Sequence, residues 1–291
     1  MGLQQLAQQI IDLYSFRAFK PALEDHSCPL ASRLRGKTAA FLSLGDTGVT
    51  LGTVSFNKKG QGSFSDFRFT AGPVSEQLSP AIINELRKRT NCGAVIVSYG
   101  RTAEVQIINS AQRWPEPSLN ETLVANPGAL MGSQLNEKFV YSGYYHQSES
   151  SLLVASTPAE QIDVLVDSLA AAKLTPVRVQ SSHLGLLNIA LANVDARQGS
   201  RCVVVLDHGL AISVATHSGH WGNSRSVPVR SDAELRTLIE QVVFEQPVLL
   251  IATNNSSVKD IDSCLSGLDA IRLELPGINS LELSAYVAIQ L

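Results

Sequence analysis

The sequence lacks the features of several large protein classes. Its four cysteines (Cys28, Cys92, Cys202 and Cys264) include no Cys-x-x-Cys pair, which argues against a disulfide framework or a structural zinc site and favours a reducing compartment. No run approaches 18 consecutive apolar residues, so no membrane-spanning segment is predicted. The net charge is -3 and the basic clusters are small, so no nucleic-acid partner is expected. The chain is therefore predicted to be cytoplasmic.

The N-terminus also lacks a signal peptide, because it has no basic start, no apolar core and no cleavage site. Leu3, Leu6, Ile10 and Tyr14 fall at helical spacing and predict a helix that packs on the body of the protein. A helix that binds a partner or a membrane surface is the alternative. The absence of lysine and arginine before Arg17 disfavours it.

The composition is that of an ordinary globular protein, with 44% apolar and 17% charged residues. The chain of 291 residues is long enough to form two lobes. Residues 38–69 predict three strands joined by a Gly-rich turn and a hairpin turn. Ser79 and Pro80 then predict the start of a helix, and "GAVIVSYG" and "AEVQIINS" predict two further strands. The irregular residues 111–150 are expected to form a small inserted subdomain with one helix and one or two strands.

Strands and helices alternate again after the insertion. "SSLLVAS" predicts a strand that leads into a helix with a Thr157–Glu160 capping box and Pro158 as its first residue, followed by the strand "TPVRVQ" and a second helix. A buried hairpin, "VVVLDHGLAISVATHSG", opens the second half. Ser231 and Glu234 predict another capping box. We therefore expect an N-terminal helix and linker (1–37), a first lobe (38–197) and a second lobe (198–291).

One unit occurs twice in the sequence. Placing "FLSLGDTGVTLGTV" over "VVLDHGLAISVA" aligns Gly45 with Gly209, 164 positions later, and Ser43 with Asp207. Both copies predict a strand, a glycine turn and two further strands, then a helix after a polar gap. The repeat predicts two lobes of similar topology; two unrelated hairpins are the alternative.

With this repeat, the chain resembles the actin-like ATPases, and more closely the PilM-type proteins of type IV pilus assembly and the cytoplasmic domains of GspL-type secretion proteins. The stretches that carry the resemblance are "SLLVASTPAEQIDVLVDSLAAAKLTPVRVQSSHLGLLNIAL", "VVVLDHGLAISVATHSGHWGNSRSVPV" and "PGINSLELSAYVAIQL". It covers residue 38 to the end. It implies an α/β, two-lobed actin-like (ribonuclease H-like) fold with duplicated mixed β-sheets flanked by helices and a small inserted subdomain.

The resemblance also implies a nucleotide site, and Gly45, Asp46, Asp207 and Gly209 are its candidate remnants. The pattern of the family is altered at several positions. In the first hairpin, the family has an aspartate two residues before the glycine and often a basic residue after it, whereas this chain has Ser43 and Thr50 at these positions. Gln180 stands where the family usually has a further aspartate. Thr253, Asn254 and Asn255 stand where the family has the adenosine-binding Gly-Gly turn. Catalysis through a positioned magnesium ion would be badly impaired. We expect no enzymatic activity and no cofactor, with a working ATP-binding protein or ATPase as the alternative.

The resemblance implies the following role: a scaffold on the cytoplasmic side of a bacterial pilus or type II secretion inner-membrane platform that binds the cytoplasmic tail or a domain of a membrane partner. The insertion at 111–150 would form one wall of the groove that holds this tail, and self-association is plausible. An unrelated two-lobed α/β protein is the third reading. His208, His217 and His220 match no common metal-ligand spacing and are expected to be exposed, and helix capping explains Ser181 and Ser182 beside His183 better than nucleophilic catalysis does.

Overall fold

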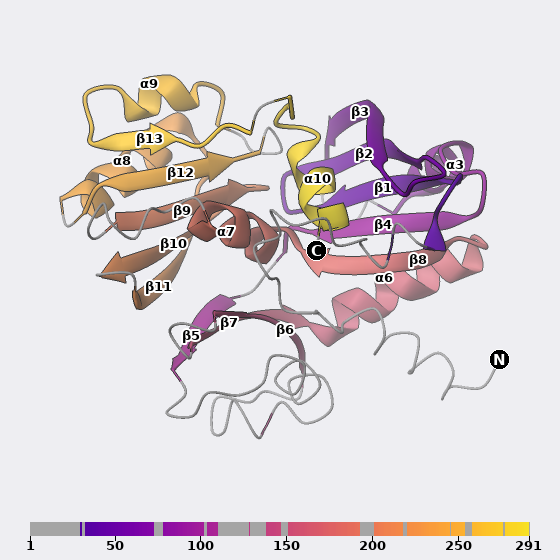
Figure 1. Ribbon diagram of the computed structural model, residues 1–291, viewed down its shortest axis with the longest axis horizontal. Helices are drawn as coiled ribbons and strands as arrows, with labels where there is room; N and C mark the ends of the chain where they lie inside the picture. Colours follow the sequence, from indigo (N-terminus) through magenta and orange to yellow (C-terminus); the bar gives the residue numbers. More distant parts are fainter. Residues whose placement is uncertain are drawn as a thin grey trace.

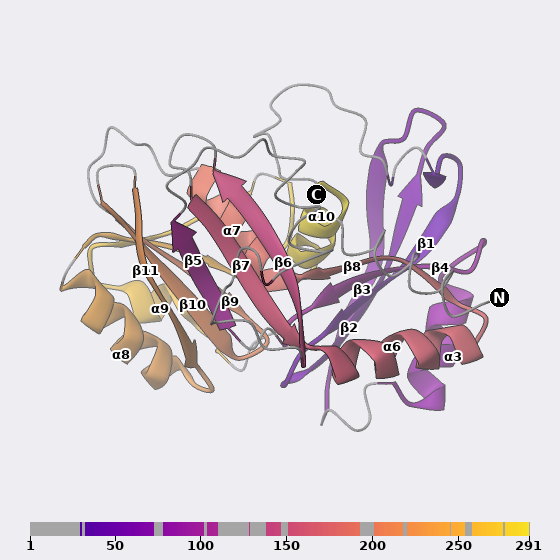
Figure 2. The same ribbon diagram turned by 90° about the horizontal axis from the view of Figure 1, so that it is seen from below.

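The computed structural model shows two lobes side by side, with a third, smaller sheet beneath their junction (Figures 1 and 2). It describes residues 30, 33–72, 78–101, 104–109, 128, 138–146, 151–192, 201–217, 220–244, 246–253, 258–275 and 277–290. The predicted N-terminal helix and most of the 111–150 insertion, including its predicted helix, lie outside these residues. No helix of the described part is long and apolar enough to cross a membrane.

The sheet of the first lobe has five strands in the order β3-β2-β1-β4-β8. β1 pairs antiparallel with β2 and parallel with β4, so the sheet is mixed. One face packs against two helices through Leu86 of α3 and Ile162, Leu165 and Leu169 of α6. The elements are β1 (Thr38–Leu44), β2 (Gly48–Phe56), β3 (Gly62–Ala71), α3 (Pro80–Lys88), β4 (Ala94–Tyr99), α6 (Ala159–Ala171) and β8 (Thr175–Ser181).

The second lobe repeats this sheet, with the strand order β11-β10-β9-β12-β13. β9 pairs antiparallel with β10 and parallel with β12, as β1 pairs with β2 and β4. α8 and α9 cover one face. The elements are β9 (Arg201–Asp207), β10 (Leu210–His217), β11 (His220–Pro228), α8 (Asp232–Val243), β12 (Val248–Ala252), α9 (Ile261–Leu265) and β13 (Ala270–Arg272). The predicted duplication of mixed sheets is confirmed.

Two helices are exchanged between the lobes. α7 (Ser182–Ala192) follows the last strand of the first sheet, but its Leu184 and Leu187 pack into the core of the second lobe. α10 (Leu283–Gln290) ends the second half of the chain, yet its Ala285 and Ala288 cover the open face of the first sheet. The two helices also pack against each other (Figure 1). Each lobe therefore buries a helix that the sequence order assigns to the other lobe.

The third sheet is antiparallel and has the order β5-β7-β6. Its strands are β5 (Glu104–Asn109), β6 (Phe139–His146) and β7 (Ser151–Pro158). β7, which the sequence indicated as a strand leading into the next helix, is the central strand of this small sheet. The subdomain sheet therefore extends beyond residues 111–150 on both sides, since β5 precedes this range and β7 follows it. Val105, Leu153 and Ala155 of these two strands pack against the core of the second lobe.

Helix starts agree in part with the capping predictions. The Ser231 hydroxyl accepts a hydrogen bond from the Glu234 amide at 3.3 Å, as predicted for α8. Ser79 precedes α3 with Pro80 in its first position, but the Ser79 side chain makes no capping hydrogen bond. The predicted Thr157 cap is wrong, because β7 runs through Pro158 and this proline is itself the N-cap of α6.

Candidate functional site

The two hairpin turns singled out in the sequence meet at the junction of the lobes. The first turn, Gly45 to Thr47, joins β1 and β2. The second is a two-residue turn, because Asp207 pairs directly with Leu210. A Cβ atom on Gly209 would come within 2.9 Å of a Thr47 methyl group, so the turns lie in contact. The structure therefore brings three of the four candidate residues together: Gly45, Asp207 and Gly209.

His208 fills the space between the two turns. The residue is 1% exposed, so the expectation of an exposed histidine is wrong for His208. A Cβ atom on Gly45 would overlap the ring, and one on Gly100 would come within 2.6 Å of its Cδ2. Both glycines leave room for an imidazole. The glycine of the first turn thus has a packing reason that involves no phosphate.

The backbone directs His208 into this position. His208 and Gly209 have φ angles of 49° and 78°, as in the type I′ turns that match the twist of β-hairpins. Among non-glycine residues, histidine adopts positive φ more readily than most. The burial of His208 could have been inferred from the internal repeat. The repeat aligns His208 with Leu44, an apolar residue that ends a buried strand.

The hydrogen bonds of His208 end in the opposite lobe. Nε2 lies 2.8 Å from the Ser43 hydroxyl on β1, and Nδ1 lies 3.5 Å from the Thr47 hydroxyl. The ring also lies 6.4 Å from the ring of Phe69 on β3. Burial lowers the pKa of His208, because a charged ring would lose its hydration, although the neighbouring Asp207 acts in the opposite direction. The bridge between the lobes is therefore formed by the neutral imidazole at neutral pH.

Asp207 is fully buried beside this bridge and is bonded by hydroxyl groups from other elements. Thr253, just after β12, donates to its Oδ1, and Ser182 at the start of α7 also bonds to the carboxylate. Burial alone would raise the pKa of Asp207, but a positive charge on the His208 or His183 ring and the hydrogen bonds from the two hydroxyls favour the carboxylate, and together they lower its pKa. The carboxylate therefore joins three elements of the junction.

His183 on α7 is also buried and holds the second turn from behind. Its Nε2 lies 3.2 Å from the carbonyl oxygen of Asp207 and 3.1 Å from that of Leu210. Since carbonyl oxygens only accept, Nε2 carries the proton. Burial lowers the pKa of His183. The capping prediction for the neighbouring serines is confirmed at Ser181, whose hydroxyl accepts from the Leu184 amide at 3.3 Å.

A row of buried polar side chains crosses the first sheet next to the bridge. Thr50, Ser43, Ser98 and Gln180 lie opposite one another on β2, β1, β4 and β8. The Ser98 hydroxyl and both polar atoms of the Gln180 amide have no hydrogen-bond partner among the described residues, so we expect ordered water there. The row contains no carboxylate. Of the described residues, only Asp207 supplies a buried carboxylate at the junction.

Asp46, the fourth candidate, does not enter the junction. Its side chain is 73% exposed, and it pairs with Arg101 at 3.7 Å between Oδ1 and Nε. Asn254 and Asn255 of the predicted adenosine turn lie outside the described residues, and so do the side chains of His217 and His220. Among the described residues, no three His, Cys, Asp or Glu side chains converge as metal ligands. The assignment of the four candidates to a nucleotide site stays a prediction.

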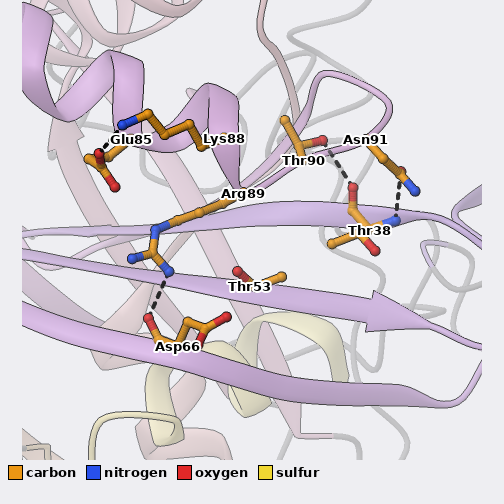
Figure 3. A pocket seen from close by; sticks show the side chains of 8 residues that line it. All are labelled: Thr38, Thr53, Asp66, Glu85, Lys88, Arg89, Thr90 and Asn91. Carbon is orange, nitrogen blue, oxygen red and sulfur yellow. Dashed lines mark hydrogen bonds and ion pairs between the residues drawn. The ribbon is translucent and has the colours of Figure 1, made fainter.

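Two open pockets lie outside the junction. One, of about 490 Å³, lies between α3 and the first sheet (Figure 3), and its polar groups largely bond to one another: Lys88 to Glu85, Arg89 to the carbonyl of Asp66, and Asn91 to the amide of Thr38. The other, of about 800 Å³, adjoins the ends of β12 and β13 and is lined by Ala252, Arg272, Leu273, Glu274, Leu275, Gly277, Ile278, Asn279, Ser280, Glu282 and Leu283. Neither pocket contains the residues of the junction.

The duplicated sheets, the exchanged helices and the paired hairpin turns define an actin-like ATPase fold. Comparison of the sequence with protein-family models and with curated proteins finds no match. Comparison with solved structures does. The chain is similar to a protein of Bacteroides thetaiotaomicron with actin-like ATPase fold and unknown function, at 10% identity and a TM-score of 0.54 over 88% of this chain and 97% of that one.

Two further similar structures come from pilus and secretion systems. One is a chain of the PilM-PilN type IV pilus biogenesis complex, with 13% identity and a TM-score of 0.58 over 87% of this chain and 97% of that one. The other is the cytoplasmic domain of EpsL, an inner membrane component of the type II secretion system of Vibrio cholerae, with 12% identity and a TM-score of 0.53 over 87% of this chain and 95% of that one. The predicted fold is confirmed.

Proposed function

We propose that this protein is a non-enzymatic scaffold in a bacterial pilus or type II secretion assembly, and that it binds a cytoplasmic segment of an inner-membrane partner. The fold is shared with a chain of the PilM-PilN complex and with the cytoplasmic domain of EpsL. At the identities found, this similarity supports the fold, and the role is our inference from it. Such a protein would act on the cytoplasmic side of the inner membrane.

The observation that carries the non-enzymatic part of the proposal is the position of His208. A phosphate bound between the two turns would need their backbone amides and the space beside Gly45, and the imidazole occupies that space. The neighbouring polar row offers hydroxyls and an amide in place of the carboxylates that organise magnesium. Asp207 is engaged with Ser182 and Thr253.

Calorimetry and thermal unfolding with Mg-ATP test this part. A ligand at about a hundredfold its dissociation constant stabilises the folded state by roughly 2.7 kcal/mol, which a thermal melt resolves easily. We expect no shift for the natural protein at millimolar Mg-ATP. A shift that Asp207→Ala abolishes would support the alternative of an actin-like ATP-binding protein or ATPase, and would refute the non-enzymatic scaffold.

The binding part of the proposal needs a separate experiment. Synthetic peptides that match the cytoplasmic tails of the inner-membrane pilus or secretion proteins of the same bacterium are titrated into the protein by calorimetry. Saturable binding of one tail, and none of a scrambled peptide of equal composition, is the expected result. If every tail fails while the protein is folded by circular dichroism, the scaffold role in these systems is wrong.

A further inference from the structure

His208 is a single side chain that joins the two lobes. It belongs to the turn between β9 and β10 of the second lobe, and its ring nitrogens approach the Ser43 and Thr47 hydroxyls of the first lobe. Gly45 and Gly100 close around the ring from the first-lobe side. Loss of this contact would leave an imidazole-sized gap between the two turns.

The charges around the ring do not provide a full counter-charge for a proton. Asp207 in the same turn and Asp46 in the first turn favour the charged ring, while His183 on α7 and Arg101 after β4 disfavour it. Asp207 is bonded to other groups, and Asp46 is largely exposed. With burial added, the balance lowers the pKa of His208 below its ordinary value. The enclosed position is therefore a place for a neutral ring.

We propose that His208 is an acid-sensitive latch between the lobes. In its neutral form the ring holds the two hairpin turns together through Ser43 and Thr47. Once it takes up a proton from solvent, the ring leaves the enclosed position and the two turns separate. The proton binds to the ring nitrogen that the open state exposes to water, and no other reactant is needed. The latch concerns the protein without any ligand or partner, so it does not depend on the proposed scaffold role.

The size of the effect follows from proton linkage. An exposed histidine has a pKa of 6.5, and the closed state resists protonation. The equilibrium constant for opening then rises as the pH falls below this value, by about tenfold between about pH 7.5 and about pH 5.5. A tenfold change of this kind shifts the equilibrium between closed and separated turns. In the open state that we propose, the sheets beneath the turns stay folded.

Amide hydrogen exchange, corrected for the intrinsic pH dependence of exchange, is the test. The reporting amides lie next to the ring: Gly45, which donates to the Gly48 carbonyl, and Gly100, which donates to the Leu44 carbonyl. Peptides from the centres of β9 and β12 serve as the reference for global unfolding. The variants are His208→Gln, which cannot titrate but keeps a hydrogen-bonding group, and His208→Ala, which keeps neither.

We expect the corrected exchange of the turn peptides in the natural protein to rise about tenfold on acidification, and to stay faster than that of the reference peptides at both pH values. The His208→Gln protein should show no such rise, and the His208→Ala protein should exchange rapidly at both pH values. A natural protein whose turns are insensitive to pH would overturn the latch, and so would an equal rise in His208→Gln or turn exchange no faster than that of the reference peptides. If His208→Ala does not fold, the comparison with His208→Gln decides.

Discussion

The substitution Gly45→Ala tests whether this glycine is present because of His208. The Cβ atom would overlap the imidazole ring, which has little room to move between the two lobes. Gly45 itself does not have a positive φ, so its backbone can accept an alanine. The whole penalty should therefore come from the contact with His208. Overpacking of a buried site costs about 1–3 kcal/mol, and we expect a loss of stability in this range.

A double-mutant cycle separates this contact from other causes. A Cβ atom on Gly45 would overlap the Cβ atom of His208 as well as its ring, so the second substitution is His208→Gly, which removes both and suits the positive φ of this position. In that background Gly45→Ala should be neutral or stabilise the protein by about 0.4–1 kcal/mol through the unfolded chain. The coupling free energy between the two substitutions is expected to be about 2 kcal/mol. Independent sites are additive within about 0.3–0.5 kcal/mol, so a coupling of this size is measurable.

Urea unfolding followed by circular dichroism gives the four free energies of the cycle. Gly52→Ala is the matched control, because a Cβ atom there would come within 2.5 Å of the ring of Phe67 on the neighbouring strand, with no contact to His208. It should destabilise by less, because the half-buried ring of Phe67 can shift, and His208→Gly should not change its effect. Additive effects of Gly45→Ala and His208→Gly would refute the packing argument for this glycine.

Three further predictions concern the junction and the helix starts. Asp207 and His208 both have lowered pKa values in the folded state. The free energy of unfolding should therefore fall as the pH drops below about 6.5, where an unfolded histidine takes up a proton, and fall further near pH 4, where an unfolded aspartate does. A free energy of unfolding that stays constant over this range in urea titrations would contradict the burial argument. Thr253→Val removes a hydroxyl that donates to the buried Asp207 carboxylate and should cost about 1.5–3 kcal/mol by urea unfolding, whereas a cost under about 0.5 kcal/mol would show that this hydrogen bond does not hold the junction. Ser231→Ala should lower the melting temperature, because a lost cap costs about 1 kcal/mol, and Ser79→Ala, which removes no capping bond, should leave it unchanged; equal effects would contradict the cap geometry.

The sequence predicted the two sheets well, because their strands are short, apolar and bounded by turn residues. The hairpin at Asn57 to Gly60 and the buried strand at Ala94 to Tyr99 are examples, and the repeat that aligned Gly45 with Gly209 predicted that the two lobes have similar topology. Local patterns of this kind need no knowledge of distant contacts. They therefore predict the elements and the class of fold.

Contacts between distant elements could not be predicted in the same way. α7 and β7 have apolar faces, but an apolar face in the sequence does not indicate which sheet it will pack against. In the structure both elements pack on the second lobe. His208 was misjudged for the same reason: a polar residue in a turn is usually exposed, and here the turn is covered by the opposite lobe, 165 residues away in sequence at Ser43. The two turns were predicted correctly and the burial of His208 between them was missed, while their assignment to a nucleotide site stays a prediction.

The junction explains how the hairpins hold their geometry with protein groups alone. In a two-lobed protein that closes on a ligand, the ligand supplies the contacts that join the lobes, and the closed state depends on its concentration. Here the ring of His208, bonded to Ser43, and the carboxylate of Asp207, bonded to Thr253, supply contacts around the turns from within the chain. An internal group is always present and loses less entropy on closing than a free ligand does. The contacts around the turns therefore need no bound ligand, and under the proposed latch their opening depends on the protonation of His208.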